Sequence, residues 1–311
     1  MTDVMRVLKP GVFTTVQDLG RPNAVSAGVP TGGAMDRFAH RAANLLAGNE
    51  EGAATLECTL SAPHLQAVHS CLVALAGADF DPQVNGRPAP MWTGIFLSEG
   101  DELAFAGRRS GGRAYIAIAG GIAGDRWLGS LSTYMLVARG GMHGRQLLAG
   151  DVIAVAGGPL APAISGRHLA DRLRPDYHDH ALPSIAGPHV RRLDAGGRKV
   201  LFGSPFKISR DADRMGYRLE GPVLDAPGEE LLSFGLTAGA IQVPRSGQPI
   251  LLMADHQTAG GYPVVAVVAG AAMPVAAQLL PGDEVSFTEV SVEAALRIRA
   301  AQRAALDSLI S

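Results

Sequence analysis

The sequence predicts a mainly β protein with a few helices. Glycine and proline are frequent, at 39 and 20 of 311 residues, and they divide the chain into short apolar segments of strand length. A Gly-Asp pair followed by alternating apolar residues occurs three times, beginning at Gly100, Gly150 and Gly282. Gly-Asp favours a tight turn, and the alternation indicates a strand with one buried face. Turns and strands of this kind are typical of barrels and sandwiches.

Three further segments indicate strands. Residues 72–76 form a compact apolar run, and residues 79–90 contain Asn85-Gly86, a strong hairpin signal because both central residues need positive φ. Residues 115–119 are apolar throughout and precede Gly120-Gly121. This pattern indicates a strand that is buried on both faces or packed closely against other backbone.

Helices are expected in three places. Asp36 is an N-cap for a helix that ends near Leu46, with an apolar face built around Phe38 and Ala42. A second helix is predicted from Ser291 to Leu309. A third, over residues 193–201, is weakened by Gly196-Gly197.

The segment from Gly157 to Pro188 is rich in Gly, Pro, Asp and His, and it predicts a domain boundary. The expected organisation is a first barrel, a linker, a second barrel and a C-terminal helix, at residues 1–157, 158–188, 189–290 and 291–311. His178-Asp179-His180 lies in this segment without further ligands at a set spacing, so no metal site is predicted.

Composition excludes several classes of protein. A formal net charge of −2 and the absence of basic runs argue against nucleic acid as the main partner. No stretch of 18 apolar residues offers a membrane span, and the first ten residues lack the apolar region of a signal peptide. Cys58 and Cys71 form no Cys-x-x-Cys pair and are expected to be reduced thiols in a cytoplasmic protein.

Several catalytic motifs are also absent. None of the three lysines follows a glycine, so a Walker A phosphate loop cannot form. The chain has no Gly-x-Ser-x-Gly elbow, no His-Glu-x-x-His and no Met-Lys-Met site for carrying biotin. If ATP or a tethered cofactor takes part, this chain is expected either to bind it in an unconventional way or to receive it from another subunit.

Polar side chains gather instead at glycine-bearing turns. The four segments are 11–22, 28–36, 213–222 and 239–263. The third holds four charges, a phenol and two glycines in ten residues, which suits a small polar ligand. In the fourth, an apolar run delivers Asp255, His256 and Gln257 to its end, where site residues are common. The alternative for each segment is a structural turn whose charges face water.

The order and wording of these motifs resemble the carboxyltransferase subdomain A/B family, which includes allophanate hydrolase subunit 2-like proteins, the C subunit of bacterial 5-oxoprolinase and part of urea carboxylase. The resemblance extends from about Val7 to Phe287. Its motifs are Thr14-Thr-Val-Gln-Asp-Leu-Gly-Arg21, Gly33-Ala-Met-Asp36, Ala43-Asn-Leu-Leu46, Gly187-Pro-His189, Asp213 to Pro222, Gly239-Ala-Ile-Gln-Val-Pro244, Gly247-Gln-Pro-Ile250 and Gly260-Gly-Tyr-Pro263.

The resemblance implies two cyclophilin-like β-barrel domains and a B-type partner subunit made of subdomains C and D. It implies that the chain is the C-type subunit of a heteromeric, ATP-dependent, 5-oxoprolinase-like amide or lactam hydrolase. A separate lactam-hydrolase subunit is a further possible partner. ATP would be used by the complex.

Two alternatives stay open. One is a biotin-dependent carboxyltransferase component that acts on urea or a related amide, with biotin on a separate carrier. The other is a regulatory partner of a kinase-inhibitor protein, which would bind without turnover.

The hypothesis for the site follows the family motifs. Asp255 with His256 is the candidate base, and Tyr217 is the candidate oxyanion donor. Arg214 and Arg218 are expected to clamp a carboxylate or phosphate. The remaining substrate-binding candidates are Gln17, Asp18, Arg21, Asp213, Gln242, Gln257 and Tyr262.

Four positions depart from the expected pattern, the first being Asn23, which stands in place of a common glycine. His256 and Ala259 replace an arginine and a threonine, and Val264 stands where a basic residue often follows Tyr-Pro. The lost cationic groups are expected to weaken anion binding near Tyr262.

Overall fold

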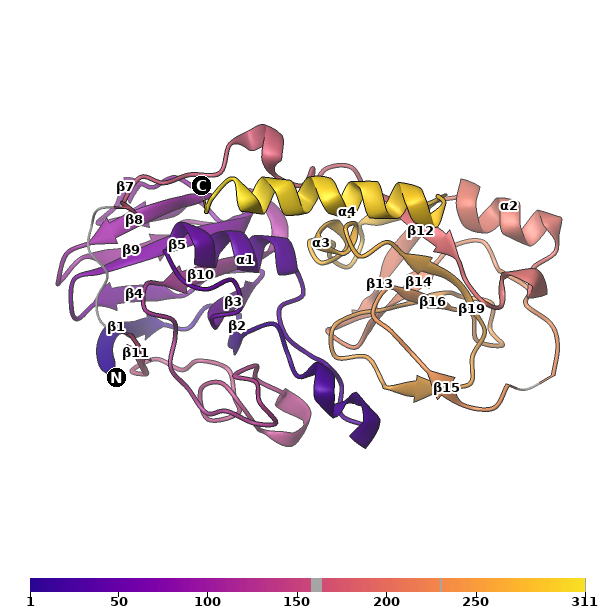
Figure 1. The fold of residues 1–311 in the computed structure, drawn as a ribbon, viewed down its shortest axis with the longest axis horizontal. Coiled ribbons are helices and arrows are strands. Elements are labelled where there is room, and N and C mark those ends of the chain that lie inside the picture. Colours follow the sequence, from indigo (N-terminus) through magenta and orange to yellow (C-terminus); the bar gives the residue numbers. More distant parts are fainter. Residues whose placement is uncertain (158–163, 230, 311) are drawn as a thin grey trace. The chain divides into compact units, whose positions relative to one another are not determined.

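The computed structural model describes residues 1–157, 164–229 and 231–310. Packing divides the chain into two compact units. Unit 1 contains Met1–Arg21, Asp36–Arg174 and Ala304–Ser311, and unit 2 contains Pro22–Met35 and Pro175–Arg303. Strands dominate both units, which confirms the mainly β fold class (Figure 1).

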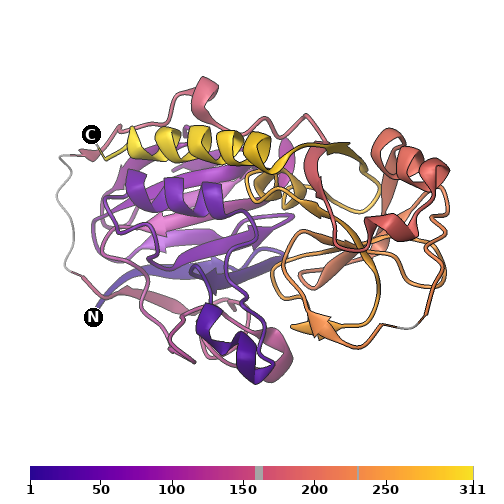
Figure 2. The ribbon, with the colours of Figure 1, turned by 45° about the vertical axis from the view of Figure 1, so that its right-hand side comes forward.

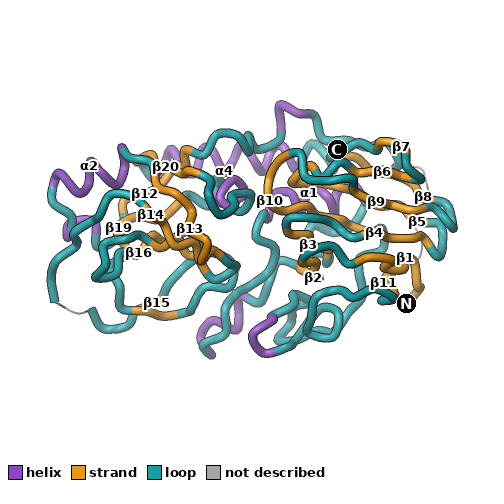
Figure 3. The backbone as a smooth tube through the Cα atoms, turned by 180° about the vertical axis from the view of Figure 1, so that it is seen from behind, coloured by secondary structure: helices purple, strands orange, loops and turns teal. Residues whose placement is uncertain are grey.

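Unit 1 is built from two antiparallel sheets (Figure 3). The first has the order β11 (Val152–Val155), β1 (Thr2–Lys9), β4 (His64–Ala67), β9 (Glu102–Phe105), β6 (Pro82–Val84) and β7 (Arg87–Pro88). The second has the order β2 (Phe13–Gln17), β3 (Thr55–Thr59), β10 (Ser110–Ile118), β5 (Cys71–Asp79) and β8 (Thr93–Leu97).

The second sheet of unit 1 is covered on both faces. One face shares a core with the first sheet, in which Val7 and Leu103 pack with Leu56, Val73 and Ile116. Helix α1 (Arg37–Leu46) packs on the other face, over β5 and β10. Strands β5 and β10 are therefore buried nearly throughout, and the apolar run that begins at Tyr115 is covered on two sides, as the sequence predicts.

Turn chemistry places the strands as predicted. Asn85 and Gly86 have φ of 51° and 74° and join β6 to β7. Gly100, Gly150 and Gly282 have φ between 89° and 99°, and each precedes an aspartate whose carboxylate accepts a hydrogen bond from the backbone N–H three residues earlier. The same turn therefore begins β9, β11 and, in unit 2, β20 (Glu284–Glu289).

Unit 2 contains a closed barrel (Figure 2). Its strand order is β12 (Ala181–Ala186), β19 (Val264–Val268), β16 (Ala240–Gln242), β17 (Ile250–Leu252), β14 (Gly216–Glu220), β13 (Phe206–Ala212) and β20. The ring closes through a parallel pairing of β12 with β20, and the other pairs are antiparallel. Phe206, Tyr217, Leu251 and Phe287 are among the buried residues that fill it.

The remaining described elements are short, apart from one helix. They are the two-stranded pair β15 (Phe234–Gly235) and β18 (Ala259–Gly260), the 3-10 turns η1 (Pro22–Ala27), η2 (Met135–Val137), η4 (Asp171–Leu173) and η5 (Val190–Arg192), and helices α2 (Ala195–Gly203), α3 (Met273–Ala276) and α4 (Val292–Asp307). No helix among the described residues is long and apolar enough to cross a membrane.

The helix predictions agree closely with the structure. Asp36 caps α1 by accepting a hydrogen bond from the N–H of Ala39 at 2.8 Å. The Ser291 hydroxyl accepts one from Ala294 at 3.2 Å at the start of α4. Helix α2 begins after Asp194, whose carboxylate bonds Gly197, so it is shifted by two residues from the predicted span.

The predicted domain bounds differ from the structure in several places, and the expected C-terminal helix of residues 291–311 is divided between the two units. Strand β12 lies inside the expected linker of residues 158–188, where Pro183 and the polar surroundings disguise it as a loop. Residues 22–35 pack with unit 2, whereas the sequence predicts them in the first barrel. Residues 158–163 of the expected linker lie outside the described part of the chain.

Candidate functional site

Five of the predicted substrate-binding residues meet at one cavity of unit 2, with a volume of about 540 Å³. They are Asp213, Arg218, Gln242, Gln257 and Tyr262. They come from the turn between β13 and β14, from β14 and β16, and from the segments on either side of β18. The barrel therefore brings side chains separated by up to about 50 positions in the sequence to one polar hollow.

Alternation along β14 decides which of its side chains reach this cavity. Gly216 and Arg218 line it, whereas Tyr217 and Leu219 are each 1% exposed and pack in the barrel core. Successive strand residues point to opposite faces, so Tyr217 and Arg218 cannot serve one ligand on the same face. The structure thus corrects the role expected for Tyr217, whose ring belongs to the core and does not line the cavity.

Asp213 and Arg218 form the charged rim. The Asp213 carboxylate accepts hydrogen bonds from the backbone N–H groups of Met215 at 2.7 Å and Gly216 at 3.2 Å, which fixes the turn before β14. Arg218 is exposed and forms no ion pair with any residue that the structure describes. Its guanidinium is therefore available to a ligand. The Asp213 carboxylate, by contrast, also stabilises the turn before β14.

Two amides lie in the floor of the cavity, of which Gln242 is buried and Gln257 is exposed. Gln242 is 1% exposed, and its Oε1 accepts a hydrogen bond from Gln257 Nε2 at 3.3 Å. The Gln242 amide nitrogen also lies 3.5 Å from the carbonyl oxygen of Tyr262. A Cβ added at Gly260 would lie 3.4 Å from Gln242 Nε2, so this residue keeps the amides close to the loop backbone. The floor therefore presents amide donors and acceptors in a fixed arrangement.

Arg214 and Asp255 are paired with each other. Arg214 Nε and Nη2 donate to the two Asp255 oxygens at 2.8 and 3.1 Å, and the two side chains are 12% and 11% exposed. Arg214 Nη2 also donates to the carbonyl of Gly33 at 2.7 Å, and Gly32 N–H donates to the carbonyl of Ala254. The pair fastens residues 22–35 to the barrel, and neither member lines the cavity.

His256 also does not line the cavity. It is 5% exposed, and its Nδ1 donates to the carbonyl of Gln257 at 2.7 Å. Burial lowers the pKa of His256, against an opposing effect from this hydrogen bond and from Asp255. A neutral, partnered imidazole in this position supports the loop that carries Gln257.

Asp18 is a buried anchor of unit 1. Its carboxylate accepts hydrogen bonds from the hydroxyls of Ser130 and Ser132, both at 2.6 Å, and from the N–H groups of Leu131 and Gly20. Burial alone would raise the pKa of Asp18, but these four hydrogen bonds outweigh it and hold the pKa below its ordinary value.

Gln17 and Arg21 accompany Asp18. Gln17 donates to Thr15 and to the carbonyl of Thr133, and Arg21 donates to the carbonyl of Ser132. The Arg21 guanidinium also lies 5.0 Å from the ring centre of Trp127. All three predicted residues thus brace their own unit, and the cavity of unit 2 does not include them.

Sequence reasoning missed several residues that line the cavity. They are Asp211, Met215, Gly216, Pro244, Arg245, Ser246, Ile250 and Leu252. Arg245 directly follows the motif Gly239-Ala-Ile-Gln-Val-Pro244, and this position in the sequence could have identified it as a site residue. Among the described residues, no group of three or more His, Cys, Asp or Glu side chains could hold a metal ion.

The arrangement can bind a small neutral amide. Gln242 and Gln257 supply paired donors and acceptors, while the Arg218 guanidinium and the Tyr262 hydroxyl supply donors to a carbonyl oxygen. Ile250 and Leu252 add apolar surface. A concave site with a few convergent polar groups over apolar side chains is the usual form of a small-molecule site.

Residues 27–289 match the sequence model of a family described as "Carboxyltransferase domain, subdomain A and B". A relative in Escherichia coli (strain K12), the C subunit of 5-oxoprolinase, is 35% identical over 309 residues, covering 98% of this chain and 97% of the relative. The protein of the same name in Haemophilus influenzae is 33% identical over 299 residues, covering 95% and 94%.

Among solved structures, the crystal structure of the K. lactis urea amidolyase superposes with a TM-score of 0.93 at 28% identity. The match covers 99% of the present chain and 20% of the amidolyase. The chain therefore corresponds to about one fifth of that longer protein.

Proposed function

The chain belongs to the family of the carboxyltransferase domain, subdomains A and B, and on this premise we propose that it is the C-type subunit of a 5-oxoprolinase-like amide or lactam hydrolase. One observation carries the proposal. The similarity to the 5-oxoprolinase C subunit of E. coli extends over nearly the full length of both proteins, whereas the urea amidolyase is matched over only a small part.

The cavity of unit 2 suits the amide of a lactam. Ring opening builds negative charge on the lactam oxygen, and donors aimed at that oxygen stabilise the transition state. We assign this task to Arg218 and to the Tyr262 hydroxyl, with Gln242 and Gln257 orienting the amide. We assign Asp255 and His256 a positioning role. Asp255 is bonded to Arg214 and His256 is bonded to the carbonyl of Gln257, and these bonds hold the loop on which Gln257 lies.

The partners follow from the proposal. The two bacterial relatives are each named as one subunit of 5-oxoprolinase, which supports a multi-subunit enzyme. We expect a B-type subunit of the same family and a separate lactam-hydrolase subunit. ATP hydrolysis would take place in the complex, since this chain has no Gly-Lys pair for a Walker A loop. Two free, buried thiols suit the expected cytoplasmic location.

A second candidate is a carboxyltransferase component that acts on urea. The close superposition on the K. lactis urea amidolyase favours it, and carboxyl transfer also needs donors to an amide oxygen. This alternative requires biotin on a separate carrier protein.

The test is ADP release by this chain co-expressed with its B-type subunit and the lactam-hydrolase subunit. We expect 5-oxoproline to stimulate ADP release, and we expect the stimulation to disappear when this chain is omitted. Urea in place of 5-oxoproline is the matched control.

Stimulation by urea that depends on a biotinylated carrier would replace the first proposal by the second. Stable association of the subunits without stimulation by either compound would favour the regulatory alternative.

A further inference from the structure

The cavity of unit 2 that suits an amide, the amide cavity, lies across four neighbouring barrel strands, β13, β14, β17 and β16. Arg218 of β14 pairs with Ile250 of β17, and Ile250 pairs in turn with Gln242 of β16. All three residues line the cavity and therefore form a row across it. Because neighbouring strands are about 4.8 Å apart, the backbone positions of Arg218 and Gln242 are separated by roughly 10 Å.

A bulge in β13 adds a carboxylate to the Arg218 end of this row. The register of β13 against β14 shifts before Ala212, so that residues 209–211 lie against Arg218 alone. Ala212 packs on the barrel core, and successive strand residues face opposite sides, so Asp211 faces the cavity that it lines. The Asp211 N–H donates to the Ser209 hydroxyl at 3.1 Å, which fixes the bulge. Bulges beside functional sites commonly redirect a side chain in this way.

Asp211 and Arg218 are neighbours that do not pair. The Asp211 carboxylate has no hydrogen bond or ion pair with any residue that the structure describes, and the Arg218 guanidinium has none within the same residues. The Asp213 carboxylate, by contrast, is occupied by two backbone N–H groups of its turn. Opposite charges on adjacent strands ordinarily attract each other across a regular ladder. The bulge instead leaves one acceptor and one donor side by side at the cavity.

An amide whose C=O and N–H lie on the same edge matches this acceptor and donor. In an ordinary trans amide the two groups point in opposite directions, whereas the ring of a lactam holds the amide cis and turns both to one side. The oxygen and nitrogen are then only about 2.2 Å apart, so two adjacent protein groups have to serve them. Asp211 and Arg218 are adjacent, whereas the amide of Gln257 is bonded to Gln242 at the other end of the row.

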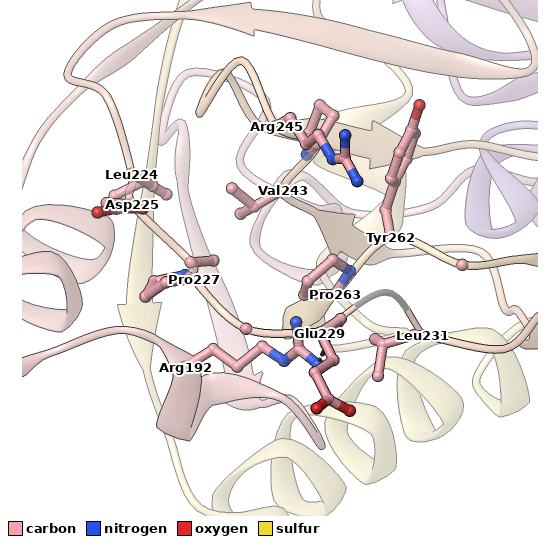
Figure 4. A pocket seen from close by; sticks show the side chains of 14 residues that line it. Arg192, Leu224, Asp225, Pro227, Glu229, Leu231, Val243, Arg245, Tyr262 and Pro263 are labelled. Atoms are coloured by element: carbon pink, nitrogen blue, oxygen red, sulfur yellow. Dashed lines mark hydrogen bonds between the residues drawn. The ribbon is translucent and has the colours of Figure 1, made fainter.

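A second cavity of about 350 Å³ adjoins the amide cavity beyond the end of β16 and shares Pro244, Arg245 and Tyr262 with it. In Figure 4 the Tyr262 ring stands beside the Arg245 side chain at this border. Two arginines and two carboxylates line the second cavity, so its walls favour neither sign of charge. Asp211 and Arg218 line only the amide cavity, so the pair that faces an amide edge is confined to it.

We propose that Asp211 is a specificity-determining residue, whose carboxylate accepts the N–H of an amide while Arg218 donates to the C=O on the same edge. The inference rests on the proposed function of the amide cavity, and it applies to both candidates because a lactam and urea each present such an edge. The substrate class is amides with an N–H on the same side as the carbonyl oxygen. N-alkylated lactams and trans amides are excluded, because they leave the Asp211 carboxylate without a donor.

The test compares the dissociation constants of 5-oxoproline and N-methyl-5-oxoproline by calorimetry, on the complex of this chain with its B-type subunit. Asp211→Ala should weaken the binding of 5-oxoproline about 10- to 100-fold, the range for a hydrogen bond to a charged group. It should not weaken the binding of the N-methylated compound, which has no N–H. Asp211→Asn keeps a neutral acceptor and should lose less. Glu220→Ala is the matched control, because Glu220 is exposed on β14 and lines neither cavity.

The inference is overturned if Asp211→Ala weakens the binding of both compounds equally or of neither, since the residue would then not distinguish the N–H. Thermal melting checks that each variant is folded. A titration with urea separates the inference from the lactam assignment. If urea binds, Asp211→Ala weakens its binding and 5-oxoproline does not bind, the lactam assignment fails while the role of Asp211 stands. If the wild-type complex binds neither compound, the proposed function and the role of Asp211 fail together.

Discussion

The polar motifs of unit 1 and unit 2 look alike in the sequence and differ in the structure. Gln17, Asp18 and Arg21 are buried, and each has partners within its own unit. Arg218 and Tyr262 are exposed at a cavity. A motif of charged and amide side chains therefore marks either an internal brace or a binding site. The distinguishing property is whether the side chains are enclosed within their own unit or exposed at a cavity.

The largest effect is expected at Asp18. Asp18→Ala removes the acceptor of four hydrogen bonds and leaves buried donors without a partner, which should cost about 4 kcal/mol of unfolding free energy. Denaturant unfolding measures the loss. Because the pKa of Asp18 is lowered in the folded state, its contribution is present above its unfolded pKa and is lost as the pH falls through the folded value. A wild-type midpoint in this variant would mean that the motif is not a brace.

Arg214→Met should cost about 3 kcal/mol, since it leaves the Asp255 carboxylate nearly buried without its cation. The matched test is the double variant Arg214→Met with Asp255→Leu, which should recover most of the loss. If Arg214→Met instead leaves the unfolding free energy unchanged and abolishes only ligand binding, Arg214 belongs with the site and not with the braces.

His40, a buried residue of unit 1, should make the unfolding free energy depend on pH. Burial lowers the pKa of His40 from 6.5 to about 4, and nearby carboxylates oppose the shift only partly. As the pH falls, His40 therefore gains its proton at a higher pH in the unfolded chain than in the folded chain. The contribution of His40 to the unfolding free energy is fully present above pH 6.5 and falls by about 2 kcal/mol toward pH 4.5. His40→Gln should flatten this part of the stability curve, and an unchanged slope would assign the effect to other groups.

Arg218→Gln should have the smallest effect on stability and a clear one on function. The side chain is exposed and makes no ion pair with a described residue, so unfolding should change by less than about 0.5 kcal/mol. The KM for 5-oxoproline should rise about tenfold in the ADP-release assay. Arg210→Gln is the control, because Arg210 is exposed on β13 and lines neither cavity of the barrel.

Local signals predicted much of the fold. The Asp36 cap, the Asn85-Gly86 hairpin and the repeated Gly-Asp turns act within a few residues, so the sequence carries them directly. Strand β12 was missed because Pro183 masks it, and its pairing with β20 joins segments about 100 residues apart. Such pairings depend on the whole barrel and leave no local pattern.

The site was predicted only in part. Strand alternation could have separated Tyr217 from Arg218, because Tyr217 and Leu219 share one face of β14. Arg214 and Asp255 lie 41 positions apart in the sequence and bond to each other. The sequence predicted both as ligand-binding or catalytic residues, because it gives no sign of this pairing. Asp211 lies outside the predicted motifs, and the bulge that turns it to the cavity depends on the pairing of β13 with β14.

The most direct measurement is the change in backbone amide NMR signals when 5-oxoproline is added to this chain, isotopically labelled, in complex with its unlabelled B-type subunit. The cavity of unit 2 predicts saturable shifts at Arg218, Gln257 and Tyr262, and none at Gly20 or Leu131 beside Asp18. Shifts at Gly20 and Leu131 without any at Arg218, Gln257 and Tyr262 would contradict the assignment of the substrate site to unit 2.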